Sequence, residues 1–122
     1  MANEEVVINT VRSYSIGMIG RSLNQARSNN FIIDEPAYYE GGLGQALGPA
    51  EAFLSGISSC GVLLIQGQAA KNNIPFEKVE ITIQALRDKN DMSWFKGVDM
   101  KVDVTGPSEE QARELVSFYQ EH

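Results

Sequence analysis

The stretch that decides the fold runs from Pro49 to Asn73 and reads PAEAFLSGISSCGVLLIQGQAAKNN. Pro49 suits the first position of a helix, because the backbone N–H that proline lacks would be unpaired there anyway. Glu51 suits the positive end of the helix dipole. The pair Asn72-Asn73 and the following Pro75 are typical helix stops. The stretch therefore predicts one long helix.

This predicted helix is apolar around most of its circumference. Its main apolar stripe recurs at helical spacing and consists of Phe53, Leu54, Ile57, Cys60, Leu64 and Ile65. Val62 and Leu63 extend the apolar surface away from that stripe. A helix that is apolar on most sides is buried on more than one side. We therefore expect it to lie at the centre of the fold.

The residues after this helix predict a hairpin and a second helix. Apolar and polar residues alternate over 78–85 and again over 98–105, which is typical of half-buried strands. We expect these two strands to pack their apolar faces on the central helix. Residues 108–111 have the form of a capping box and begin the second helix. Its buried stripe is expected to be Ala112, Leu115, Val116 and Tyr119.

The residues before the central helix predict three short strands and a loop. From Val6 to Ile33, β-branched and polar residues alternate loosely between glycines, which is typical of antiparallel strands joined by tight turns. Asp34-Glu35-Pro36 ends the third strand, and a glycine-rich loop of about a dozen residues follows. Because the element order contains no βαβ unit, the sequence predicts an α+β fold.

The length of 122 residues is enough for one compact core, so we expect a single domain over residues 1–122. A single sheet and one amphipathic helix do not cover every side of the central helix. The uncovered remainder indicates a partner subunit.

Composition and charge exclude several classes of function. Ten Lys and Arg against sixteen Asp and Glu give a net charge of −6, the wrong sign for binding nucleic acid or an anionic membrane. One cysteine and one histidine exclude an intrachain disulfide and a His-rich metal site. The start of the chain lacks the features of a secretory signal, and no run of eighteen apolar residues occurs. We expect a cytoplasmic protein without a bound metal or cofactor.

Cys60 is the first candidate for chemistry, although a lone cysteine on an apolar stripe is ordinarily a small hydrophobic residue. Its neighbours along the chain are small: Gly56, Ser58, Ser59 and Gly61. They allow a ligand or another helix to approach the sulfur closely. Cys60 lies eleven residues after Pro49, about 16 Å along a helix, too far for the helix dipole to lower the pKa of its thiol. A reactive thiolate there needs a cation from elsewhere.

The candidate cations are the arginines of the predicted strands, Arg12, Arg21 and Arg27, although each is also an ordinary surface charge. Glu51 is a candidate anchor for such an arginine. It lies nine residues before Cys60, on the opposite side of the same helix and about 13.5 Å away along the axis. Glu51 therefore acts only across an interface or by holding an arginine, unless it merely stabilises the helix N-terminus.

Four motifs together resemble the OsmC/Ohr family of osmotically induced and organic hydroperoxide resistance proteins. They are FIIDEP at 31–36, the pair Gly41-Gly42, GPAEAFL at 48–54 and Ser58-Ser59-Cys60. The resemblance extends over most of the chain, including the predicted hairpin and the Val104-Thr105-Gly106 step before the last helix. It implies an intertwined homodimer with antiparallel sheets packed around the central cysteine helices, and a site at the subunit interface.

The resemblance also implies a chemistry. Characterised peroxidases of the family use a cysteine thiolate, which Cys60 matches, and hold it reactive with an arginine and a glutamate. Arg21 fits a Gly-Arg turn, whereas Arg27 fits the segment before Asp34-Glu35-Pro36. Glu51 stands two residues after Pro49, where the best-known peroxidases carry the glutamate directly after the proline.

A second cysteine follows the last helix in the family, and a dithiol such as a lipoyl group reduces the disulfide that it forms. This sequence ends at His122 without it, so we expect that a C-terminal segment is lacking or that the chain is a one-cysteine variant. In either case turnover of this chain needs an external thiol or dithiol.

The leading hypothesis is thiol-dependent reduction of organic or lipid hydroperoxides, as part of an oxidative stress response. The alternative is a non-catalytic dimeric module of the same fold that binds an apolar small molecule. A third interpretation, a purely structural domain, requires that Cys60 be fully buried.

Overall fold

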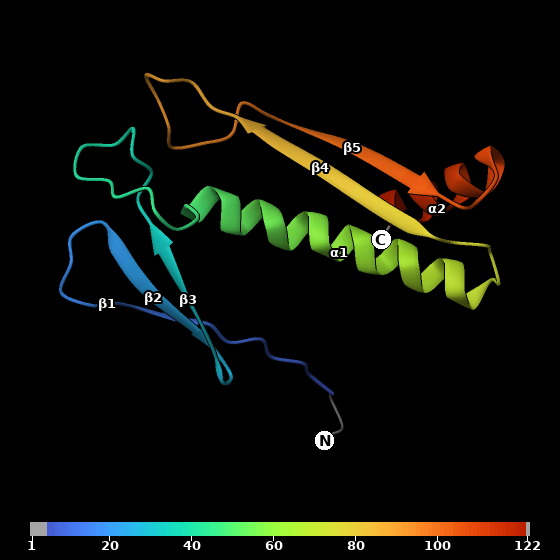
Figure 1. Cartoon of the computed structure of the whole chain (residues 1–122), viewed down its shortest axis with the longest axis horizontal. Helices are drawn as coiled ribbons and strands as arrows, with labels where there is room; N and C mark the ends of the chain where they lie inside the picture. The colour runs from blue at the N-terminus through green and yellow to red at the C-terminus, as the bar shows by residue number, and fades with distance from the viewer. Residues whose placement is uncertain (1–4, 122) are drawn as a thin grey trace. The chain divides into compact units, whose positions relative to one another are not determined.

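The structure is a computed structural model that describes residues 5–121, and it divides into two compact units, one up to Ala52 and one from Phe53 onward (Figure 1). The elements in chain order are β1 (Arg12–Ser15), β2 (Arg21–Ala26), β3 (Asn29–Asp34), α1 (Pro49–Lys71), β4 (Lys78–Leu86), β5 (Gly97–Thr105) and α2 (Glu109–Glu121). This content of antiparallel sheets and helices confirms the predicted α+β fold.

The first unit contains a three-stranded antiparallel sheet in the order β1-β2-β3. A tight turn at residues 27–28 joins β2 to β3, so that Arg21 at the start of β2 pairs with Asp34 at the end of β3. Arg27 was expected within a strand, but it lies in this turn with a φ of 55°. The left-handed conformation that the turn requires explains the difference.

Residues Val6 to Val11 were expected to belong to a strand, and that expectation is wrong for this chain. They have no regular secondary structure, and Val7 is 86% exposed. The reason lies in the register, because Arg12 already pairs with Gln25, close to the end of β2. Residues 6–11 precede Arg12, and β2 ends at Ala26, so β2 provides no partner strand for them.

The loop between β3 and α1 is irregular, as predicted. Close packing requires a glycine at one of its positions, and backbone conformation favours a glycine at another. A Cβ at Gly42 would lie 1.9 Å from the backbone oxygen of Pro36, so no larger residue fits there. Gly44 has a φ of 63°, in the left-handed region that glycine adopts freely.

The second unit packs the β4–β5 hairpin against α1 (Figure 1). The hairpin pairs Lys78 with Thr105 at one end, as predicted, and Leu86 with Gly97 at the other, where it is one residue pair longer than predicted. Its core consists of Ile65, Ala69 and Leu115. The partly buried apolar residues around this core are Ile74, Phe76, Val79, Ile81, Val102, Val104 and Tyr119.

The face of α1 that packs inward differs from the predicted stripe. Its buried residues are Gly61, Ile65 and Ala69, which recur every four residues. Cys60 was placed on the buried stripe but is exposed, because it lies about 100° around the helix from Gly61. Leu63 is 63% exposed in the single chain. Apolar surface of α1 therefore remains open.

By length and composition α1 is also able to cross a membrane, since its mean hydropathy reaches 1.3 over eighteen residues. The core helix of a globular protein meets the same criterion. The packing of Ile65 and Ala69 against the residues of the hairpin is that of a core helix.

Gly61 is the position where α1 fits most tightly against its neighbours. A Cβ there would lie 2.7 Å from both Ile81 Cδ1 and Tyr119 Cζ, whereas a Cβ at Gly67 on the same helix meets nothing within 4 Å. We expect Gly61→Ala to lower the free energy of unfolding by about 1–3 kcal/mol through overpacking. The matched variant Gly67→Ala should raise it by up to about 1 kcal/mol, because alanine favours helix. Urea unfolding measures both, and equal effects of the two substitutions would contradict this packing.

Candidate functional site

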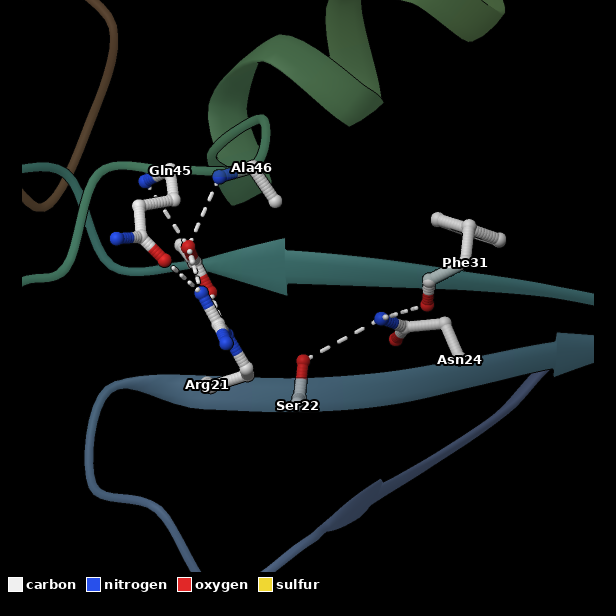
Figure 2. A network of polar contacts seen from close by, with 7 residues as sticks. Arg21, Ser22, Asn24, Phe31, Gln45 and Ala46 are labelled. Atoms are coloured by element: carbon white, nitrogen blue, oxygen red, sulfur yellow. Dashed lines mark hydrogen bonds and ion pairs between the residues drawn. The ribbon is translucent and has the colours of Figure 1, made fainter.

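The most highly connected polar group of the first unit is the carboxylate of Asp34 (Figure 2). Because Arg21 and Asp34 are cross-strand partners, the guanidinium reaches the carboxylate with two parallel bonds. Nε of Arg21 donates to Oδ1 at 2.7 Å, and Nη2 donates to Oδ2 at 2.9 Å. This bidentate pair fixes both side chains.

Asp34 also holds the loop that precedes α1. Its Oδ2 accepts hydrogen bonds from the backbone N–H of Gln45 at 3.0 Å and of Ala46 at 2.8 Å. The backbone N–H of Asp34 donates to the carbonyl oxygen of Leu47 at 3.0 Å. The side chain of Asp34 is fully buried. One carboxylate therefore joins the ends of β2 and β3 to residues 45–47.

These bonds determine the charge state of Asp34. The hydrogen bond from Arg21 lowers the pKa of the Asp34 carboxyl well below its usual range, and the backbone bonds from Ala46 and Gln45 lower it further, against the opposing effect of burial. The hydrogen bond with Asp34 in turn raises the pKa of Arg21. Both groups are therefore charged at neutral pH.

Glu51 makes a different contact from the one expected of an arginine anchor. Its Oε1 accepts a hydrogen bond from the backbone N–H of Gly48 at 2.7 Å, while the Ala52 N–H donates to the carbonyl of Gly48 at 3.0 Å. Glu51 thus caps the first turn of α1, as the glutamate at helix position N3 of a capping box does. The carboxylate that holds Arg21 is that of Asp34.

The structure separates the candidate arginines. Arg21 belongs to the Asp34 network, whereas Arg27 is exposed in the turn at the other end of β2. Arg12 donates to Oε1 of Gln25 at 2.8 Å, and its guanidinium lies 4.7 Å from the centre of the Tyr14 ring. Sequence reasoning missed the role of Asp34, although its place at the end of the third predicted strand was a usable signal.

Cys60, in the second unit, lies in an open groove of about 460 Å³ on α1. The groove is lined by Phe53, Gly56, Ile57, Cys60, Leu64 and Tyr119. The Tyr119 hydroxyl lies 3.4 Å from the carbonyl oxygen of Ile57, to which it donates a long hydrogen bond. The thiol is thus exposed beside mostly apolar side chains in the single chain, whereas the purely structural interpretation requires it to be fully buried.

Aromatic residues of the hairpin loop extend the apolar surroundings of this groove. Phe95 stacks on Phe53 with ring centres 6.0 Å apart, and the guanidinium of Arg87 lies 5.6 Å from the Phe95 ring centre. Trp94 donates from Nε1 to Asp91 at 3.1 Å, which keeps the loop folded on itself. Of these two aromatic residues of the loop, Phe95 is therefore the one in contact with the groove's lining, at Phe53.

Within residues 5–121, no group of three or more His, Cys, Asp or Glu side chains is arranged to hold a metal ion. The chemistry that the described side chains offer is that of a thiol in an apolar groove and of an oriented guanidinium.

Comparison with known protein families gives one match. The family described as OsmC-like protein matches residues 42–122, which include the glycine-rich loop, the cysteine helix, the hairpin and the last helix. No curated protein matches the sequence.

Solved structures with the same fold include three with informative descriptions. An OsmC-like protein from Mycoplasma pneumoniae superposes with a TM-score of 0.81 at 16% identity, over 95% of this chain and 82% of that one. An organic hydroperoxide resistance protein OsmC from Legionella pneumophila gives 0.73 at 21% identity, over 97% and 85%. The organic hydroperoxide resistance protein OhrB of Bacillus subtilis gives 0.64 at 22% identity, over 94% and 84%. At these identities the likeness establishes the fold.

The charge of Asp34 predicts an acid-sensitive fold. Because the folded state holds the pKa of Asp34 below the value of about 4 of an unfolded aspartate, this carboxylate stabilises the protein above that pH and loses its effect as the pH falls. We expect Asp34→Asn to lower the free energy of unfolding at neutral pH and to flatten its fall below about pH 4. The exposed Asp99→Asn is the control. Urea unfolding across this pH range measures both, and an Asp34→Asn profile identical to the wild type would contradict the assignment.

Proposed function

The chain belongs to the OsmC family, and from this premise we propose that it is a thiol-dependent peroxidase that reduces organic or lipid hydroperoxides at Cys60. The observation that carries the proposal is the exposed thiol of Cys60 in an apolar groove. Such a groove suits the organic group of a hydroperoxide, because apolar surface is removed from water when the two meet. The names of the Legionella pneumophila and Bacillus subtilis proteins, which refer to organic hydroperoxide resistance, favour the same substrate class.

The reaction consists of an oxidation of Cys60 followed by its reduction in two thiol-exchange steps. In the oxidation, the Cys60 thiolate attacks the terminal oxygen of the hydroperoxide, the O–O bond breaks, and the alkoxide leaves and takes up a proton to become an alcohol. Cys60 is thereby oxidised to a sulfenic acid. In the first exchange, an external thiol attacks the sulfenic acid sulfur and water leaves. A second thiol, or the other sulfur of a dithiol such as a lipoyl group, then releases Cys60 as the thiol and becomes a disulfide.

The thiolate needs a neighbouring positive charge, because Cys60 lies too far along α1 for the helix dipole to act on it. In the proposed site this charge comes from Arg21 or Arg27. The family's peroxidases anchor the arginine with a glutamate, for which Glu51 was the candidate, but in the single chain Glu51 caps the first turn of α1 and Arg21 is held by Asp34. Neither metal nor organic cofactor takes part.

The proposed assembly is an intertwined homodimer of a single OsmC-like domain, with the site at the subunit interface. Exposed apolar residues on α1, Phe53 and Leu63 among them, are the surface that a second subunit would cover. The net charge of −6 supports small molecules and thiols as partners in preference to nucleic acid or an anionic membrane. The cytoplasm, where reducing thiols are abundant, is the proposed location.

A peroxidase assay tests the proposal. We expect the protein to consume cumene hydroperoxide when dithiothreitol or dihydrolipoamide is supplied, and Cys60→Ser to reduce the rate to that of the reductant alone. Ser59→Ala, one residue away on an exposed position of the same helix, should retain the wild-type rate.

Activity that survives Cys60→Ser would rule the proposal out. A wild-type protein that is folded and dimeric but no faster than the reductant alone would favour the alternative, a dimeric module that binds an apolar small molecule in the Cys60 groove.

A further inference from the structure

The lining of the Cys60 groove is apolar apart from two side chains. Of the lining residues that the structure describes, Cys60 and Tyr119 are the ones with a polar side-chain atom. The other lining residues are Phe53, Gly56, Ile57 and Leu64. An organic group that enters such a groove displaces water from its walls. The phenol of Tyr119 is then the side chain beside the thiol that has a proton to give.

The packing of α2 on α1 brings the Tyr119 hydroxyl to the turn that carries Cys60. This hydroxyl donates to the carbonyl oxygen of Ile57 at 3.4 Å. In an α-helix that carbonyl points toward the N–H of the residue four positions later, which is Gly61. A Cβ at Gly61 would lie 2.9 Å from the same hydroxyl oxygen. The phenol therefore lies against residues 57–61, the turn that contains Cys60.

The present hydrogen bond of the Tyr119 hydroxyl is weak enough to be exchanged. Its length of 3.4 Å exceeds the usual distance between two hydrogen-bonded oxygens, which is about 2.7–2.8 Å. The carbonyl of Ile57 has a second partner within the helix, so it stays hydrogen-bonded when the hydroxyl turns away. The ring itself is held, because Tyr119 packs against the core of the second unit.

We propose that Tyr119 is a catalytic residue, which donates its hydroxyl proton to the alkoxide that leaves the hydroperoxide. The inference rests on the proposed peroxidase function. When the Cys60 thiolate attacks, the terminal oxygen stays on sulfur with its hydrogen, as the sulfenic acid. The electron pair of the broken O–O bond goes to the other oxygen, which takes the Tyr119 proton and leaves as the alcohol. The phenolate then takes a proton from water at the open side of the groove.

This assignment agrees with general acid catalysis in two respects. A phenol is a stronger acid than an aliphatic alcohol, so transfer of its proton to the alkoxide is favourable. The donor is also placed by the fold before the substrate arrives, because the missing side chain at Gly61 leaves the space that the phenol occupies.

The variant Tyr119→Phe tests the role, because it removes the hydroxyl and keeps the ring in its place in the core. The lost hydrogen bond is long, so the fold should be retained, and thermal unfolding checks this first. The matched control is Tyr38→Phe, which removes a hydroxyl from a tyrosine that is 68% exposed in the loop before α1.

Two oxidants separate proton donation from a structural role of Tyr119. Cumene hydroperoxide releases an alkoxide, which needs a proton as it leaves, whereas 3-chloroperoxybenzoic acid releases a carboxylate, which does not. Because Cys60 is the only cysteine of the sequence, the loss of free thiol in a single turnover reports its oxidation by either reagent. Alkylation by iodoacetamide needs the thiolate but no proton donor, so it measures the reactivity of the thiol itself.

We expect Tyr119→Phe to slow the oxidation of Cys60 by cumene hydroperoxide by about a hundredfold, the lower part of the range for a positioned general acid. Its oxidation by 3-chloroperoxybenzoic acid and its alkylation should keep the wild-type rates. Tyr38→Phe should keep the wild-type rate with all three reagents.

The outcomes separate the inference from the function on which it rests. Equal slowing of Tyr119→Phe with both oxidants, or slower alkylation, would overturn the inference, since the hydroxyl would then act on the thiol or on the fold. An unchanged rate with cumene hydroperoxide would overturn it too, because another donor would supply the proton. In these cases the wild-type protein still reacts at Cys60, and the peroxidase function stands. A wild-type Cys60 that neither oxidant modifies would overturn both.

Discussion

The carboxylate of Asp34 lies fully buried at the end of β3 and accepts hydrogen bonds from Arg21 and from two backbone amides of the loop before α1. A buried charge is costly unless it is paired and fully hydrogen-bonded, so each of these partners is constrained by the same requirement. The rotamer of Arg21, the path of residues 45–47 and the position of Gly48 at the start of α1 follow from it. In the first unit, one buried carboxylate thus fixes both an arginine side chain and the loop before α1.

The second unit carries the candidate thiol, Cys60. One face of α1, with Gly61, Ile65 and Ala69, packs into the core of this unit, and Cys60 lies in an open groove. Tyr119 reaches over the turn of α1 that lacks a side chain at Gly61, so α2 forms part of the wall beside the thiol. In the proposed peroxidase, the open apolar surface serves both the organic substrate and the second subunit.

Local sequence patterns predicted the elements that local interactions determine. The long helix, the hairpin and the last helix lie within a residue or so of their expected limits, because capping signals and apolar periodicity specify them. The errors concern pairing between distant segments. Val6 to Val11 have β-branched residues but no strand opposite them, and Arg27 occupies the turn that β2–β3 pairing imposes. Likewise, Cys60 was identified as the candidate thiol, but the pairing of Arg21 with Asp34 depends on a cross-strand register that composition does not reveal.

The mass of the intact protein after a brief, substoichiometric pulse of cumene hydroperoxide shows whether Cys60 reacts with hydroperoxides. We expect the rapid gain of one oxygen atom, located at Cys60 by peptide mapping and reversed by added thiol. A thiol that remains unmodified on this time scale, or oxygen found only on methionine, would contradict it.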